Sequence, residues 1–186
     1  MKKIIALALS LMLLLGCVSA LAESADKQTI TMLGAFSITV DKLPEGYTMN
    51  VLKNSDMEYE AVIVSAEAGK PLYNLLMCFN DAWAGVNTLD DATEEDMQAV
   101  KDDFYDVLEL DDGDITFEDA KTGEGTPLLI ARGVDGCFAS VYTVYQSHEI
   151  EVVIYPTAAD GSGLSDEAID AAIAFLTNVK FTPAEK

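Results

Sequence analysis

The chain has 186 residues, half of them hydrophobic, so it can bury a core and intrinsic disorder is excluded. It carries 32 acidic residues against 11 lysines and arginines, which gives a net charge of −21 at pH 7. A surface of this sign repels phosphate backbones and anionic membranes, so it excludes nucleic-acid binding. Cations, basic peptides and neutral polymers stay possible partners, although the charge also serves solubility by itself.

The N-terminal segment has the layout of a secretory signal peptide. Lys2 and Lys3 precede an apolar run over residues 4–15, and Ala20-Leu21-Ala22 supplies a small-residue cleavage site before Glu23. The sequence therefore predicts a signal peptide over residues 1–22 and a secreted or extracytoplasmic protein. Cleavage removes two lysines and no acid, so the net charge goes from −21 to −23.

A second processing site overlaps the first. Leu14-Leu15-Gly16-Cys17 resembles a bacterial lipobox, in which Cys17 would be lipidated and become the mature N-terminus. Leu15 stands where a small residue is usual, and residues 18–22 stay apolar where a polar tether is usual. Release after Ala22 is therefore the better match, and a lipid anchor at Cys17 is the alternative. The apolar run is too short for a membrane span of about 20 residues, so we expect no transmembrane helix in the mature chain.

After a short flexible arm at residues 23–28, residues 29–186 are predicted to form one α+β domain. Strand-like runs recur with turn signals between them. They cover residues 30–40, 47–53, 59–66, 72–79, 115–121, 126–134, 137–146 and 149–155. Connections this short favour antiparallel neighbours, because parallel pairs need longer crossovers.

Two segments have the period of a helix instead, at residues 93–108 and 165–178. Thr93 and Asp96 have the spacing of a capping box, and Ser165 is a candidate N-cap. The predicted fold class is α+β, with an antiparallel sheet of about seven to eight strands layered with two main helices.

Several short motifs resemble PsbP-like proteins. They are Phe36-Ser37-Ile38-Thr39-Val40 followed by Leu43-Pro44-Glu45-Gly46-Tyr47, the hairpin from Gly125-Thr126-Pro127, and the helix from Ser165 followed by Asn178-Val179-Lys180-Phe181. The resemblance implies an α/β/α sandwich. That superfamily includes photosystem II extrinsic subunits, a Ran-binding protein and many exported bacterial proteins. Members with assigned roles mostly act by binding, and because their functions differ no functional residue is carried over.

The sequence assigns no catalytic, cofactor-binding or metal-binding residue. His148 is the only histidine, and a pair with Cys137 or Ser140 lacks an orienting acid. We expect residues 146–148 to form a loop between two strands. Ser24 and Lys27 have Ser-x-x-Lys spacing, but they lie on the predicted arm.

Three further features have two interpretations each. Cys78 and Cys137 can form a disulfide outside the cytoplasm or stay buried thiols. Arg132, the only arginine, can bind a carboxylate ligand or pair with an acid of the sheet. Trp83 can line a ligand cleft or cap the core. Residues 161–163 lack a dinucleotide fingerprint and are expected to lead into the last helix.

Two acidic clusters raise the possibility of weak calcium binding. One contains Asp90, Asp91, Glu94 and Glu95, and the other is Asp111-Asp112-Gly113-Asp114. The second does not fit an EF-hand loop, so a solvated turn is the simpler interpretation.

The function expected from the sequence is an exported, non-enzymatic binding or accessory protein of the cell envelope or exterior, whose partner is an unknown protein or envelope component. The alternatives are an extracellular hydrolase that uses paired carboxylates and a weak calcium-binding protein.

Overall fold

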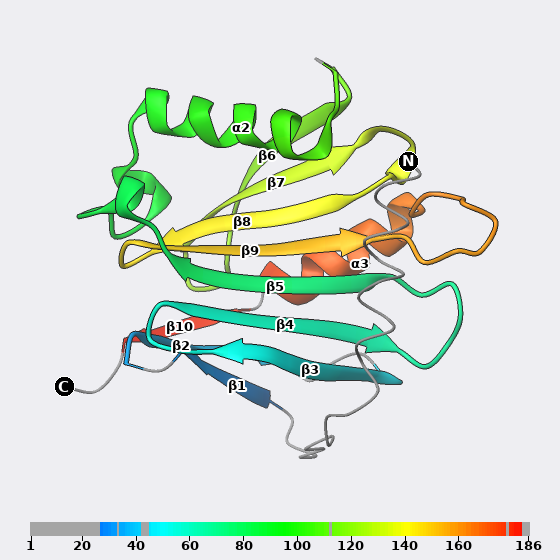
Figure 1. The fold of residues 1–186 in the computed structure, drawn as a ribbon, viewed down its shortest axis with the longest axis horizontal. Coiled ribbons are helices and arrows are strands. Elements are labelled where there is room, and N and C mark those ends of the chain that lie inside the picture. The colour runs from blue at the N-terminus through cyan, green and yellow to red at the C-terminus, as the bar shows by residue number, and fades with distance from the viewer. Residues whose placement is uncertain (1–26, 33, 42–44, 112, 178, 184–186) are drawn as a thin grey trace.

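The computed structural model describes residues 27–32, 34–41, 45–111, 113–177 and 179–183 (Figure 1). The predicted signal peptide, Cys17 and residues 23–26 of the predicted arm lie outside these residues. The strands are β1 (Lys27–Met32), β2 (Phe36–Asp41), β3 (Tyr47–Asn54), β4 (Glu58–Ser65), β5 (Leu72–Phe79), β6 (Ile115–Lys121), β7 (Pro127–Gly133), β8 (Ala139–Tyr145), β9 (His148–Tyr155) and β10 (Lys180–Pro183). The helices are α2 (Glu94–Leu108) and α3 (Asp166–Thr177), with 3-10 turns η1 (Asp81–Trp83), η2 (Leu89–Asp91) and η3 (Val134–Gly136).

The strands form two antiparallel sheets. The larger sheet has the order β3-β4-β5-β9-β8-β7-β6, and the smaller sheet has the order β1-β2-β10. Most neighbours are joined by short turns, as the sequence predicts. There are two exceptions among the described strands: β5 pairs with β9, which brings the two halves of the large sheet together, and β2 pairs with β10.

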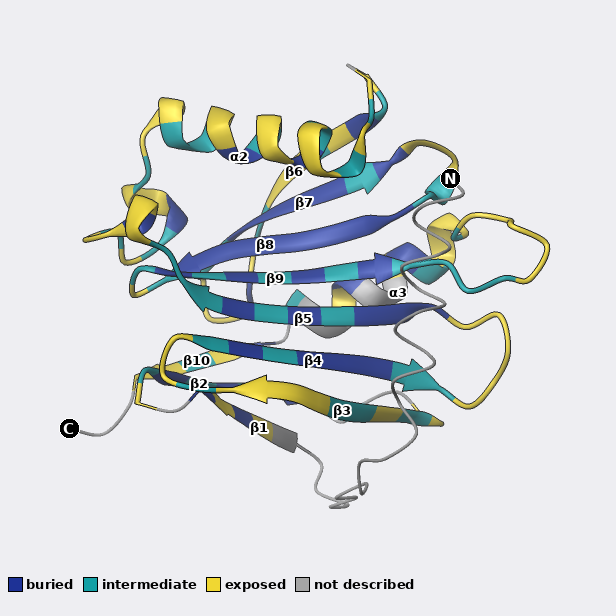
Figure 2. Ribbon diagram, in the orientation of Figure 1, coloured by how far each residue is buried: buried dark blue, intermediate teal, exposed yellow. Residues whose placement is uncertain are grey.

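The large sheet is covered by different elements on its two faces (Figure 1). On one face, α2 packs through Val100 and Phe104 against residues of β7 and β8. On the other face, α3 and the small sheet enclose the larger core, to which β4, β5, β8 and β9 contribute alternate residues. Figure 2 shows buried positions concentrated in the central strands, while the outward side of α2 is exposed. The result is an α+β fold with a helix layer on each side.

The helix boundaries follow from local capping. Thr93 accepts a hydrogen bond from the backbone N–H of Asp96, and the Asp96 carboxylate accepts from the backbone N–H of Thr93, so the predicted capping box is present. Ser165 Oγ accepts from the backbone N–H of Ala168, which confirms it as the N-cap of α3. Neither of these helices is long and apolar enough to cross a membrane, as far as the described residues extend.

The structure corrects three details near the ends of the described chain. The single run predicted over residues 30–40 is two strands, β1 and β2, because Gly34 turns the chain at φ +79°. β1 begins at Lys27, so residues 27–28 of the predicted arm belong to a strand. β10, which pairs with β2 after α3 ends, was not among the predicted strands.

Candidate functional site

A cavity of about 300 Å³ lies between α2 and the face of the large sheet that α2 partly covers. Its walls combine apolar residues of the helix with polar residues of the strands. The lining residues are Asn74, Leu76, Val100, Asp103, Phe104, Val107, Leu108, Phe138, Tyr142, Glu149, Glu151, Val153 and Tyr155. The volume is at the lower end of the range for small-molecule sites.

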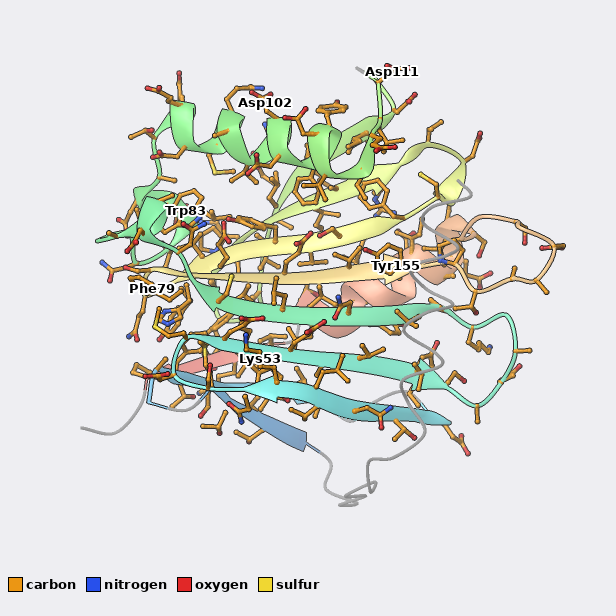
Figure 3. All side chains as sticks on the ribbon, in the orientation of Figure 1. Lys53, Phe79, Trp83, Asp102, Asp111 and Tyr155 are labelled. Atoms are coloured by element: carbon orange, nitrogen blue, oxygen red, sulfur yellow. The ribbon has the colours of Figure 1, made fainter. Side chains whose placement is uncertain are left out.

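Strand register places the polar lining residues on one face. Glu149 and Glu151 are two residues apart on β9, so their side chains leave the sheet on the same side. Asn74 of β5 is paired with Val153, the next residue of β9 on that side. Figure 3 shows Trp83 near one end of β9 and Tyr155 at the other end. The two side chains mark the limits of this stretch of the sheet.

The Glu149 carboxylate is held by three donors. Its Oε1 accepts from the Trp83 indole N–H and from the Tyr142 hydroxyl, each at 3.0 Å, and its Oε2 accepts from the Cys78 thiol at 3.6 Å. Trp83 is buried in the core beneath α2 and therefore fixes the carboxylate from a rigid position. Trp83 therefore packs in the core, as one interpretation predicts, and it is not one of the residues that line the cavity, although it orients one of them.

Glu151 has fewer partners and a shifted pKa. Its Oε1 accepts from the Ser140 hydroxyl at 2.9 Å. Burial raises the pKa of Glu151, the hydrogen bond from Ser140 works against this rise, and the negative charge of Glu149 adds to it. A carboxyl with a raised pKa in a cavity is a recognised mark of a functional site.

The cavity is rich in acceptors and lacks a countercharge. Three carboxyl groups line it, those of Asp103, Glu149 and Glu151, and its described lining contains no Lys, Arg or His. Asn74 adds a fourth acceptor, because its Oδ1 is buried and has no hydrogen-bond partner among the described residues. Buried acceptors normally have a partner, so Asn74 Oδ1 is available to accept a hydrogen bond from water or from a bound ligand.

The opposite wall is the sheet-facing side of α2. Phe104 packs against Phe138 and Tyr142 with ring centroids 6.4 Å apart in both pairs, which fixes the helix over β8. Val107 lines the cavity in the next turn of α2 and is 79% exposed. An apolar side chain this exposed marks the opening of the cavity to solvent.

Cys78 lies beside the cavity and is a free thiol, as is Cys137, so the structure has no disulfide between them. Burial raises the pKa of the Cys78 thiol to about 11, and the nearby charge of Glu149 acts in the same direction. Cys78 is therefore a hydrogen-bond donor to Glu149 and a poor nucleophile.

The structure does not bring the lone histidine near a nucleophile. His148 is the first residue of β9, where its ring packs against Phe36 and Phe79 and its Nδ1 contacts the Gln146 carbonyl oxygen at 2.7 Å. Ser140 pairs with Val153, five residues further along β9. The expected loop consists of residues 146–147 alone. Ser24 lies outside the described residues.

The acidic clusters mostly serve turns and caps. Asp91 accepts from the backbone N–H groups of Asn87 and Thr88, Asp90 pairs with Lys121 at 3.4 Å, and Asp114 accepts from the backbone N–H of Asp111. Glu94 and Glu95 lie in the first turn of α2. Within the described ranges, no group of three or more His, Cys, Asp or Glu is placed to hold a metal ion.

Arg132 pairs with a native acid, as one interpretation predicts. Its Nη2 lies 2.8 Å from Asp170 Oδ1, so the partner comes from α3 and not from a neighbouring strand. Arg132 lines a wider hollow of about 690 Å³ near the start of α3. Gly163, in the loop that leads into α3, lies so close to Asp135 that a Cβ would meet its carbonyl oxygen at 1.9 Å.

Sequence analysis did not single out the residues of the cavity. Glu149 and Glu151 alternate with Ile150 and Val152, a pattern that predicts a strand with one solvent-facing side. The pattern does not reveal that α2 covers part of this side. The one available signal was the placement of two acids at successive outward positions of an otherwise apolar strand.

Comparison with known proteins supports the fold and nothing finer. No protein family and no curated protein matches the sequence. The structure is similar to the solution structure of cyanobacterial PsbP from Synechocystis sp. PCC 6803, with a TM-score of 0.51 and 13% sequence identity. The match covers 89% of this chain and 98% of that chain. At this identity the likeness concerns the fold alone. The chain therefore has a PsbP-like fold, as its short motifs predicted.

Proposed function

We propose that this chain is an exported, non-enzymatic binding protein that takes a small ligand in the cavity between α2 and the large sheet. The observation that carries the proposal is the lining of this cavity. Glu149, Glu151 and an amide oxygen without a partner among the described residues lie on the strand wall, while α2 contributes Asp103 and four apolar residues. Few, well-placed polar groups in a largely apolar pocket are the general form of a ligand site.

The arrangement of the carboxyl groups favours binding over hydrolysis. Glycosidases place two carboxyl groups on opposite sides of the bond that is cleaved. Here Glu149 and Glu151 project from the same strand, and both oxygens of Glu149 already accept hydrogen bonds. The third carboxyl group, Asp103, lies on α2 and is exposed to solvent, so it lacks the enclosed setting in which a carboxyl group acts as a general acid. A carboxylate held as Glu149 is can orient a ligand by charge and hydrogen bonding without taking part in a reaction.

A screen for small-molecule binding tests the site. We would record ligand-detected NMR spectra for a set of neutral, anionic and cationic compounds with the wild type and with Val153→Trp, which fills the cavity from its floor. Val51→Trp, on the exposed part of β3, introduces the same residue far from the cavity. We expect binders that Val153→Trp abolishes and Val51→Trp leaves unchanged. If no compound shows this pattern, the cavity is not a binding site.

Export rests on the predicted signal peptide and has a separate test. Mass spectrometry of the protein purified from the cell that makes it reports the mature N-terminus. A start at Glu23 supports release, and a lipidated Cys17 supports anchoring. A protein that keeps Met1 would overturn the proposed location and leave the ligand site untouched.

A further inference from the structure

We propose that the ligand of this cavity is an organic cation, an ammonium or guanidinium group carried on an apolar stem. This inference rests on the proposed binding function and adds the chemical class of the ligand. Its evidence is the balance of donors, acceptors and charge inside the cavity.

On the strand wall of the cavity, each hydrogen-bond donor that contacts Glu149 or Glu151 already donates to that carboxylate. The hydroxyl groups of Tyr142 and Ser140 and the Trp83 indole N–H all donate to Glu149 or Glu151. The carboxylates have further lone pairs, and Asn74 Oδ1 has no donor at all among the described residues. A ligand that completes these bonds must therefore donate hydrogen bonds.

The negative charge of the site favours a positively charged ligand. Glu149 and Glu151 take part in none of the ion pairs that the described residues form. Charged groups withdrawn from water are normally paired, so two neighbouring carboxylates without a counterion leave a place for positive charge. Glu151 lies between Glu149 and Asn74 along this face of the sheet, so an ammonium group beside Glu151 would bring donors and a positive charge to this row of acceptors.

The helix wall indicates that the cation is organic. Val100, Phe104 and Leu108 of α2 line the cavity opposite Glu149 and Glu151 and offer contact to hydrocarbon. Phe104 and Tyr142 also present aromatic rings, which attract organic cations. A stem that runs from the carboxylates past α2 would leave the cavity near the exposed Val107.

The test compares matched probes by isothermal titration calorimetry. We would titrate n-pentylammonium, 1-pentanol and pentanoate, which share a stem and differ in charge, together with calcium chloride. We expect n-pentylammonium to bind at least roughly 10-fold more tightly than 1-pentanol, because each hydrogen bond to a charged group strengthens binding by about this factor or more. N-acetyl-lysine methylamide carries an ammonium group on a lysine side chain. Its affinity relative to n-pentylammonium tells whether the cation comes from a free amine or from a lysine side chain.

Variants link the effect to the cavity. Glu149→Gln and Glu151→Gln should each weaken n-pentylammonium binding by roughly 10- to 100-fold and change 1-pentanol binding little. Glu118→Gln on the exposed side of β6 removes the same charge far from the cavity and should have no effect. Circular dichroism checks that each variant folds. Glu151 has fewer hydrogen-bond partners than Glu149, so Glu151→Gln still tests the proposal if Glu149→Gln does not fold.

The outcomes separate the two proposals. If 1-pentanol or pentanoate binds as tightly as n-pentylammonium, and Val153→Trp abolishes that binding, the site stands and the ligand class is wrong. A preference for calcium would likewise overturn the organic cation. If no probe binds the wild type, the ligand class is wrong, and the compound screen described above decides separately whether the cavity is a binding site.

Discussion

The hydrogen bond from Tyr142 to Glu149 gives the sharpest prediction about the cavity. Tyr142→Phe removes one hydroxyl and keeps the ring, which is only 6% exposed, in the core beneath α2. The lost bond is a donation to a charged acceptor at 3.0 Å. Such bonds contribute about 1.5–3 kcal/mol, so the free energy of unfolding should fall by that amount. For a protein of this size, that corresponds to a Tm lower by roughly 3–12 °C.

The same substitution in the Glu149→Gln background isolates the charge. There the hydroxyl meets a neutral amide, and removing it should cost only about 0.5–1.5 kcal/mol. Urea denaturation followed by circular dichroism gives all four free energies of the double-mutant cycle. If Tyr142→Phe costs less than about 0.5 kcal/mol, or the same in both backgrounds, Glu149 is not the charged, oriented group described above.

Three further predictions concern stability and reactivity. Glu151→Gln should raise the Tm at pH 7, because the pKa of Glu151 is raised in the folded protein and its ionised form is therefore destabilising. The gain in Tm should fade as the pH falls toward 4.5. A lower Tm at pH 7 would contradict this. Gly163→Ala, which places a Cβ against the Asp135 carbonyl oxygen, should lower the free energy of unfolding measured with urea by about 1–3 kcal/mol. The control Gly123→Ala, whose Cβ meets no atom within 4 Å, should lower it by under about 0.5 kcal/mol. Equal losses would contradict the close approach of Gly163 to Asp135. With the other cysteines removed, Cys78 should react with a thiol reagent at pH 8 about 100-fold more slowly than free cysteine, and an equal rate would contradict its burial.

Most of the secondary structure could be predicted because its signals are local. The capping box of Thr93 and Asp96 fixes where α2 begins, whatever the helix packs against. The hairpin of β8 and β9 likewise turns at residues 146–147, between two alternating runs. Signals of this kind involve residues a few positions apart, so a single sequence contains them.

The boundary between β1 and β2 could not be found in the same way. Ile30, Met32, Phe36 and Ile38 all occupy even positions, so the alternation has the same phase on both sides of the turn at Gly34. The pattern therefore predicts one long strand. β10 was missed for a related reason, because a strand of four residues at the sheet edge forms only once β2 is in place.

The candidate site depends on contacts between distant segments. Trp83 and Glu149 are 66 residues apart, and the helix that covers the carboxylates comes from a third segment. Alternation along β9 identifies the outward positions and says nothing about what lies above them. The sequence left two interpretations of Trp83 open, and its hydrogen bond to Glu149 is visible only in the folded structure.

The central claim is that the acidic cavity beneath α2 binds organic cations, and methyl NMR spectra during a titration with n-pentylammonium test it most directly. We predict concentration-dependent shifts for the methyl groups of Val100, Val107, Leu108 and Val153, which line the cavity. The methyl groups of Val134, which lies outside this lining, should not move. Shifts confined to Val134 and other residues outside the cavity, or no shifts at all, would contradict the account.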